Sequence, residues 1–259
     1  MKPIATILLF FLPFCSIAQQ AKIDTNFHIY LLMGQSNMAG RGVLDEKSLA
    51  TDKDILMLDK SGTWQIACDP VHFDKPAAAG VGPGISFAKN LKGNSKVRIG
   101  LVPCALGGSP ISVWKSGSIY LKTFHPYDDA IARAKLAMQY GVIKGVIWHQ
   151  GESDNDSLKA SIYLDKLKIL INSLRKDLEQ PTLPFVAGEI GTFNKVNWIN
   201  RIINLLPKEV SNTAVVSSNG LTDKGDHLHF DSPSARILGE RYAHAMRDLQ
   251  LAIKNKTFH

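Results

Sequence analysis

The 259-residue sequence predicts an α/β protein of three layers, in which helices cover both faces of a central, mostly parallel sheet. Two observations predict this class. Short apolar runs with the length and composition of buried strands alternate with longer segments whose apolar residues recur at helical spacing. Such alternation is typical of βαβ units, in which a helix connects two parallel strands. The sequence shows no internal repeat, linker or low-complexity tract.

Six apolar runs are expected to be strands, at residues 27–33, 55–58, 97–103, 143–149, 184–190 and 213–217. The first of these, which contains Ile29-Tyr30-Leu31-Leu32-Met33, is continuously apolar. This pattern indicates a strand that is buried on both faces of the sheet.

Five helices are expected, at residues 84–92, 125–140, 157–179, 195–206 and 232–250. The last one begins at Ser232-Pro233, a capping residue followed by proline at the first helical position. Residues 41–83 are expected to be mostly irregular. The glycine-rich segment 80–84 lacks the Lys-Ser/Thr ending of a phosphate-binding loop, so we expect a turn or a substrate loop there.

Residues 1–18 are expected to be a secretory signal peptide. Lys2 supplies the positive charge, residues 4–14 form a short apolar stretch, and Ser16-Ile17-Ala18 provides small residues for cleavage. The stretch is too short to span a bilayer. We therefore expect a secreted or periplasmic protein with one large domain at residues 19–259. Lipidation at Cys15 is an alternative, although Phe14 stands where a small residue is expected.

The net charge of +7 is scattered along the chain. The absence of a basic run interleaved with aromatic residues argues against nucleic-acid binding, whereas a basic surface is compatible with an acidic polysaccharide. Cys68 and Cys104 remain after signal cleavage, and either a disulfide or a free buried thiol suits an exported protein. No His/Cys cluster has zinc-site spacing, so no metal is expected. The oligomeric state stays open.

Ser36 directly follows the first expected strand, between Gly34 and Gly40. A sharp strand-to-helix turn at this place would expose Ser36 as a nucleophile. Taken alone, an ordinary loop serine beside turn glycines is the better reading, and the rest of the chain reverses this preference.

Asp226 precedes His229 by three residues, in the loop before the last helix. The carboxylate can therefore fold back in one turn and accept a hydrogen bond from the imidazole, as a catalytic base requires. The alternative is helix capping, for which Asp231 is well placed.

Two further expected strands end in glycine and polar residues, at Gly107-Gly108-Ser109 and at His149-Gln150-Gly151-Glu152-Ser153-Asp154. In parallel sheets, functional sites lie outside the carboxyl ends of the strands. Three strand ends here carry such residues and no strand start does. This asymmetry indicates an enzyme.

Four motifs together resemble the SGNH hydrolase superfamily. They are Gly34-Gln35-Ser36-Asn37-Met38-Ala39-Gly40, Gly107-Gly108-Ser109, Trp148-His149-Gln150-Gly151-Glu152-Ser153-Asp154 and Asp226-His227-Leu228-His229-Phe230. They are most similar to the sialate O-acetylesterase-like branch, which includes the acetylxylan esterases of carbohydrate esterase family six. The resemblance spans residues 29–249 and implies a flavodoxin-like sandwich. The chain differs from the wider superfamily at one point. The superfamily's third motif normally supplies an Asn to the oxyanion hole, whereas this chain has Gln150 and Glu152 in that region.

The residues and the resemblance together predict a serine acetylesterase without a metal or organic cofactor. We expect Ser36 to attack the acetyl carbonyl, His229 to act as the base and Asp226 to orient it. The resemblance offers Glu152 as a rival or additional acidic partner. The backbone amides of Ser36 and Gly108 and the side chain of Gln150 are expected to form the oxyanion hole.

Five residues are candidates for substrate binding, namely Gln35, Asn37, Arg41, Trp114 and His149. For Trp114 and His149, packing in the core is an equally good reading, and Arg41 by default is a solvated side chain. The expected substrate is an acetylated polysaccharide or oligosaccharide, with acetylxylan favoured over O-acetylated sialic acid. The alternatives are another short-chain acyl esterase or thioesterase, and a carbohydrate-binding protein on a decayed scaffold.

Overall fold

The computed structural model describes residues 23–193 and 197–257, so the expected signal peptide lies outside the described residues. One seven-stranded sheet has the order β3-β2-β4-β1-β5-β6-β7. Its strands are β1 (Phe27–Gly34), β2 (Ile55–Leu58), β3 (Trp64–Ile66), β4 (Arg98–Pro103), β5 (Val142–His149), β6 (Phe185–Gly188) and β7 (Thr213–Val216). All neighbouring strands are parallel except β2 and β3. The mostly parallel sheet expected from the sequence is confirmed.

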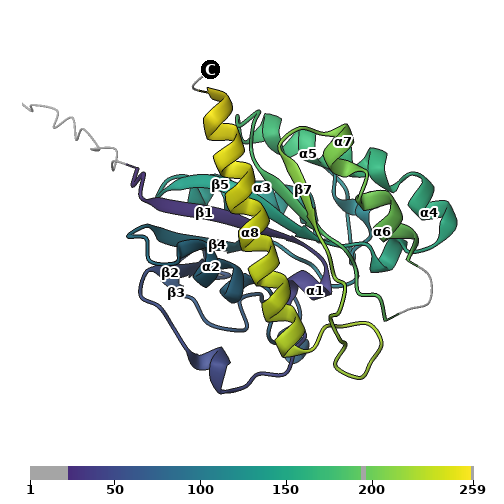
Figure 1. Cartoon of the computed structure of the whole chain (residues 1–259), viewed down its shortest axis with the longest axis horizontal. Helices are drawn as coiled ribbons and strands as arrows, with labels where there is room; N and C mark the ends of the chain where they lie inside the picture. Colours follow the sequence, from purple (N-terminus) through teal and green to yellow (C-terminus); the bar gives the residue numbers. More distant parts are fainter. Residues whose placement is uncertain (1–22, 194–196, 258–259) are drawn as a thin grey trace, which may run out of the picture.

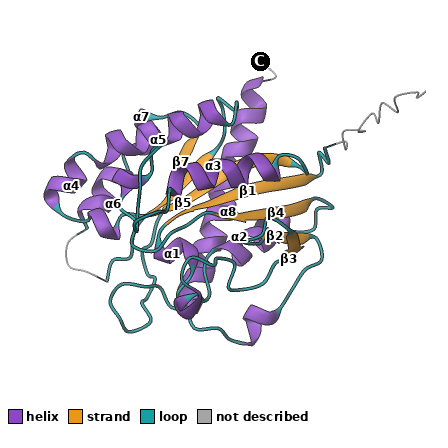
Figure 2. Cartoon of the chain, turned by 180° about the vertical axis from the view of Figure 1, so that it is seen from behind, coloured by secondary structure: helices purple, strands orange, loops and turns teal. Residues whose placement is uncertain are grey.

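The helices lie in two layers on opposite faces of this sheet (Figures 1 and 2). They are α1 (Ser36–Ala39), α2 (Gly84–Lys92), α3 (Pro126–Ala137), α4 (Ser157–Ser161), α5 (Tyr163–Asp177), α6 (Trp198–Ile203), α7 (Leu206–Glu209) and α8 (Ser232–Thr257). Helices α2 and α8 cover one face, and α3 and α5 cover the other. Among the described residues, no helix is both long and apolar enough to cross a membrane.

Strand β1 divides its side chains between the two cores. Ile29, Leu31 and Met33 pack with α3 and α5, whereas Tyr30 and Leu32 pack with α2 and α8. Side chains of successive strand residues point to opposite faces, so a strand covered on both faces must be apolar throughout. This burial fixes the register of β1 and therefore the position of the residues that follow it.

The carboxyl ends of β1, β4 and β5 meet at the centre of the sheet. Their pairing continues beyond the strands, because Leu106 donates its N–H to Gly34 and Gln35 donates its N–H to His149. The strand order reverses direction around β1, and such a switch point is the usual place of a site in an open α/β sheet.

The structure corrects several boundaries. The edge strand β3 was not predicted, because its three partly exposed residues give no apolar run. The helix expected at 157–179 divides into α4 and α5 at Ile162, whose φ and ψ of −111° and 2° are not helical. The helix expected at 195–206 is α6 followed by α7, and its first two residues lie outside the described part. Asp231 rather than Ser232 caps α8, by accepting the Ser234 N–H. Cys68 and Cys104 are both free thiols.

Candidate active site

Ser36 lies at a sharp turn between β1 and α1, as its flanking glycines predicted. Gly34 has a φ of +129°, and a Cβ there would lie 2.1 Å from the carbonyl oxygen of His149. Only glycine allows the end of β1 to pass so close to β5. Helix α1 then begins at Ser36, and the first N–H groups of a helix have no acceptor within it, so the Ser36 N–H remains available to a ligand.

The glycine-rich segment at 80–84 packs directly against this turn. A Cβ at Gly40 would lie 2.4 Å from the carbonyl oxygen of Gly80, and Gly42 and Val81 exchange two backbone hydrogen bonds. The segment is therefore a close-packed turn that supports α1, in line with the turn expected from the sequence.

Ser36, His229 and Asp226 form one chain of hydrogen bonds. The Oγ atom of Ser36 lies 3.0 Å from Nε2 of His229, and Nδ1 of His229 lies 2.7 Å from Oδ2 of Asp226. Since a carboxylate can only accept, Nδ1 carries the proton and Nε2 is free to accept the Ser36 hydroxyl proton. This is the arrangement that activates a serine nucleophile.

Asp226 is held by the turn that it forms with His229. Its Oδ1 accepts the backbone N–H groups of Leu228 and His229, and His227 adopts a φ of +54° to fold the chain back. Partial burial acts to raise the pKa of Asp226. The hydrogen bonds from the His229 amide and ring outweigh that effect and hold the pKa well below its usual range. Asp226 is thus ionised at neutral pH.

Glu152 has no hydrogen bond or ion pair with His229 in the described structure. Its Oε1 accepts a hydrogen bond from the Asn37 amide at 2.5 Å and lies 3.7 Å from Nε2 of His149. Burial raises the pKa of Glu152, although the Asn37 hydrogen bond opposes this shift. Of the two expected acidic partners, only Asp226 contacts the imidazole.

Asn37 connects the turn of Ser36 to the loop of His229. Its amide also donates to the carbonyl oxygen of Leu228 at 3.1 Å, and its Oδ1 accepts the N–H of Phe230 at 3.1 Å. The residues on both sides of His229 are therefore held by the residue next to Ser36. Asn37, a candidate for substrate binding from the sequence, is a positioning residue by this geometry.

The structure does not direct Gln150 toward an oxyanion, contrary to the sequence-based expectation. Its side chain is completely buried, and its Nε2 lies 2.7 Å from Asp154 Oδ2, 3.1 Å from Gln35 Oε1 and 3.2 Å from the Ser109 oxygen. An amide group has only two hydrogens, and three internal acceptors already compete for them. Gln150 instead links Gln35, the neighbour of Ser36, to Ser109 in the loop that follows β4.

Trp114 and His149 also lie in the core rather than against a substrate. The Trp114 indole packs edge-on against Trp148 and donates to Ser109 Oγ. His149 is fully buried, and its Nδ1 lies 3.1 Å from the Tyr242 hydroxyl. Burial lowers the pKa of His149 to about 3, so the ring is neutral. The packing alternatives considered for these two residues fit the structure.

Arg41 forms a buried ion pair with Asp74, at 2.6 Å. Asp74 Oδ2 also accepts the Gly107 N–H at 2.8 Å. Burial acts to raise the pKa of Asp74, but the hydrogen bond and charge of Arg41 outweigh this effect and lower it. Asp74 was not predicted as a site residue, since it lies in an irregular loop with no motif.

Two backbone amides are suited to hold an oxyanion. Neither the Ser36 N–H nor the Gly108 N–H donates a hydrogen bond to another described residue, and both residues line the same pocket. Gly108 has a φ of +82°, a conformation that glycine adopts readily. Asp74 holds the preceding amide, that of Gly107, and so fixes this turn.

A pocket of about 460 Å³ opens beside Ser36 and His229, and we call it the Ser36 pocket. Gln35 and Arg41 contribute to its wall, and Lys75 and Lys224 add positive charge. Lys224 Nζ lies 3.6 Å from Asp226 Oδ2. In residues 23–193 and 197–257, no group of three or more His, Cys, Asp or Glu side chains is arranged to hold a metal ion.

A family model described as carbohydrate esterase, sialic acid-specific acetylesterase, matches residues 26–248. The chain belongs to this acetylesterase family. The resemblance to the sialate O-acetylesterase-like branch is therefore confirmed, and the protein is assigned to the hydrolases that act on carbohydrate esters.

Relatives of this acetylesterase family member include a probable carbohydrate esterase of Arabidopsis thaliana. The two are 36% identical over 248 residues, which cover 87% of this chain and 92% of that protein. An X-ray structure of an Arabidopsis thaliana protein matches with a TM-score of 0.78 and 34% identity, over 87% of this chain and 99% of that chain. A carbohydrate acetylesterase from Xanthomonas citri shares the fold, with a TM-score of 0.69 and 21% identity over 86% of this chain and 57% of that one.

Proposed function

We propose that this acetylesterase family member is an exported serine esterase that removes O-acetyl groups from a polysaccharide, with acetylxylan favoured over O-acetylated sialic acid. The observation that carries the mechanism is the hydrogen-bond chain from Asp226 through His229 to the Oγ of Ser36. A nucleophile, a base and a group that orients the base are all within hydrogen-bond distance.

In the first half-reaction, the Ser36 oxygen attacks the acetyl carbonyl carbon while His229 takes the hydroxyl proton. The negative charge on the carbonyl oxygen is held by the N–H groups of Ser36 and Gly108. As the tetrahedral intermediate collapses, the bond to the sugar oxygen breaks and His229 returns its proton to that oxygen. The deacetylated sugar leaves, and Ser36 carries the acetyl group.

In the second half-reaction, water attacks the acetyl-serine and gives its proton to His229. Acetate leaves as the Ser36 oxygen recovers a proton from the imidazolium. Asp226 stabilises that imidazolium in both halves without being protonated itself.

Three features support the choice of a polymeric, extracellular substrate. The Ser36 pocket, about 460 Å³ in volume, is larger than an acetyl group needs, so it leaves room for a sugar unit. Lys224 is paired with Asp226, but Lys75 adds a positive charge that favours a chain that also bears acidic groups. The relative from Xanthomonas citri is named a carbohydrate acetylesterase. Export rests on the expected signal at residues 1–18 and is tested by N-terminal sequencing of the protein recovered outside the cytoplasm.

The activity is tested by measuring acetate released from acetylxylan and from O-acetylated sialic acid. We expect turnover of acetylxylan, its loss in Ser36→Ala, and no change in Ser95→Ala, a control on the surface. A fluorophosphonate should label Ser36. Acetate release from O-acetylated sialic acid alone would refute acetylxylan as the substrate. Labelling of a residue other than Ser36 would refute Ser36 as the nucleophile. Binding of sugar without any turnover would favour the carbohydrate-binding alternative.

A further inference from the structure

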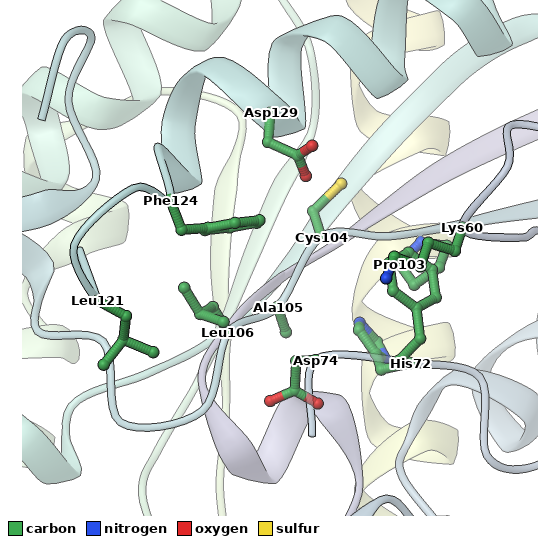
Figure 3. A pocket seen from close by; sticks show the side chains of 11 residues that line it. Lys60, His72, Asp74, Pro103, Cys104, Ala105, Leu106, Leu121, Phe124 and Asp129 are labelled. Atoms are coloured by element: carbon green, nitrogen blue, oxygen red, sulfur yellow. The ribbon is translucent and has the colours of Figure 1, made fainter. Parts of the chain in front are cut away.

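A second pocket, of about 280 Å³, lies next to the Ser36 pocket and shares none of its lining residues (Figure 3). We call it the side pocket. Consecutive residues divide between the two, because Asp74 and Leu106 line the side pocket while Lys75 and Gly107 line the Ser36 pocket. The proposed mechanism makes no use of the side pocket.

His72 gives the side pocket an unused hydrogen-bond acceptor. Its Nε2 faces the carbonyl oxygen of Leu32 at 3.4 Å, so Nε2 carries the ring proton. Burial lowers the pKa of His72 to about 4, which keeps the ring neutral. The buried Nδ1 is then a bare acceptor, and it has no hydrogen-bond partner among the described residues. A buried polar atom without a partner is uncommon and requires an explanation.

Asp129 supplies further acceptors from α3. Figure 3 shows its carboxyl group and the ring of His72 on opposite sides of the side pocket. The carboxyl group is partly buried and accepts no hydrogen bond from the described residues. Lys60 lies in the lining as well, and the charge of Asp74 is compensated by Arg41. Arg133, whose guanidinium lies over the Phe73 ring, is a cationic neighbour of Asp129, and Lys60 is exposed to solvent. Both carboxyl groups of the lining therefore have a cationic neighbour, which favours an uncharged ligand that donates hydrogen bonds over a cation.

The loop before α3 forms an apolar wall of the side pocket. Phe124 and Leu121 are 37% and 59% exposed, so both present apolar surface to an incoming molecule. Phe73 lines the pocket too, but the guanidinium of Arg133 lies over its ring, 4.8 Å from the centroid. Phe124 thus offers the aromatic surface that remains available (Figure 3).

We infer that the side pocket binds one neutral sugar ring, separately from the Ser36 pocket. The C–H groups of such a ring would pack on Phe124 and Leu121, while its hydroxyl groups would donate to His72 and Asp129. The volume of about 280 Å³ lies just below the usual range for drug-sized ligands, which begins at about 300 Å³, so the side pocket suits a ligand no larger than a single ring. The choice of a sugar among neutral hydrogen-bond donors rests on the proposed function. A sugar held here would place a carbohydrate chain beside the Gly107–Gly108 turn.

The test uses xylobiose, which carries no acetyl group, in a titration followed by the nitrogen NMR signals of the histidine rings. We expect the His72 signal to move, because its Nδ1 gains a hydrogen bond. Phe124→Ala and Asp129→Ala should each raise the dissociation constant at least about tenfold, as expected for one lost contact of about 1.4 kcal/mol. Tyr140→Ala, at an exposed aromatic residue outside the pocket, is the matched control.

Hydrolysis of 4-nitrophenyl acetate is measured on the same variants and should stay within about twofold of the wild type. Binding without hydrolysis in the wild type would leave the side pocket supported and refute the proposed activity. Shifts of the His229 signal alone, or affinities that neither Phe124→Ala nor Asp129→Ala changes, would overturn the inference. Melting temperatures of both variants exclude a general loss of folding.

Discussion

The carboxylate of Asp74 holds the backbone N–H of Gly107, one residue before the proposed oxyanion donor Gly108. The same oxygen is paired with Arg41, so the turn is fixed by a buried charge rather than by backbone contacts alone. An oxyanion hole is effective when its donors are already in place before reaction. Asp74 therefore acts on the chemistry through the peptide that it positions.

Asp74→Asn should lower kcat for 4-nitrophenyl acetate by about 10-fold to 100-fold, with KM nearly unchanged. This loss is smaller than the roughly 10²–10³ expected when an oxyanion donor is removed, since Gly108 itself remains. Steady-state kinetics provide the measurement, and Asp52→Asn, at a surface pair with Lys92, is the control. A change confined to KM would assign Asp74 to substrate binding instead.

Asp226→Asn should damage catalysis far more than Glu152→Gln. Replacing the orienting carboxylate of a serine protease triad costs about 10⁴ in kcat, because the wrong tautomer is favoured. A glutamine at position 152 still offers an oxygen to Asn37, so we expect kcat of Glu152→Gln to fall by less than about tenfold. Steady-state measurement of kcat for the two variants tests this ranking. A severe loss in Glu152→Gln with a mild one in Asp226→Asn would reverse the assignment.

Gln150→Ala should destabilise the protein more clearly than it slows the reaction. Removing this amide leaves Asp154 and Gln35 with fewer partners in a buried site, at a cost of about 1–3 kcal/mol. Chemical denaturation gives the stability, and kcat is measured at a temperature where the variant is folded. If kcat falls by 10² or more while stability is unchanged, the amide does reach the oxyanion in the reacting complex.

Asp69 should make stability depend on pH. Burial raises its pKa to about 7, so the folded state retains a proton that the unfolded chain loses near pH 4. This contribution to stability is complete below about pH 4 and is lost as the pH rises toward 7. Asp69→Asn should thus be more stable than the wild type at pH 8, by at most about 4 kcal/mol, and similar at pH 4.

Urea denaturation at both pH values tests this prediction, with Asp165→Asn as an exposed control. Equal stability differences at pH 4 and pH 8 would contradict it.

Ester hydrolysis should decline steeply as the acyl chain lengthens. With the alcohol part of the ester occupying most of the Ser36 pocket, only a small space remains for the acyl group, and each added methylene then changes discrimination by roughly 10–200-fold. Rates with 4-nitrophenyl acetate, butyrate and octanoate measure the preference. Faster turnover of octanoate would indicate an esterase for long acyl chains.

The sequence predicted the parts of the site that depend on local pattern. The apolar run of β1, the glycine after it and the three-residue spacing of Asp226 and His229 each determine a conformation within a few residues. They led to Ser36 and its base without any knowledge of the packing.

The remaining parts depend on contacts between distant segments. Asp74 reaches Gly107, 33 positions later, from a loop without regular structure. Gln150 was expected to face the substrate because it follows a strand, but the buried Asp154 draws its amide inward. Neither the direction of a side chain at a strand end nor the partner of an irregular loop can be read from one sequence.

The link from Ser36 to His229 joins residues 193 positions apart. During synthesis the nucleophile leaves the ribosome early, whereas its base follows only when the last part of the chain is made. A nascent chain that stops before residue 229 therefore has the serine but nothing to activate it. Esterase activity therefore requires that synthesis has passed residue 229, and an assay during translation would time the closure of the His229 loop onto Asn37.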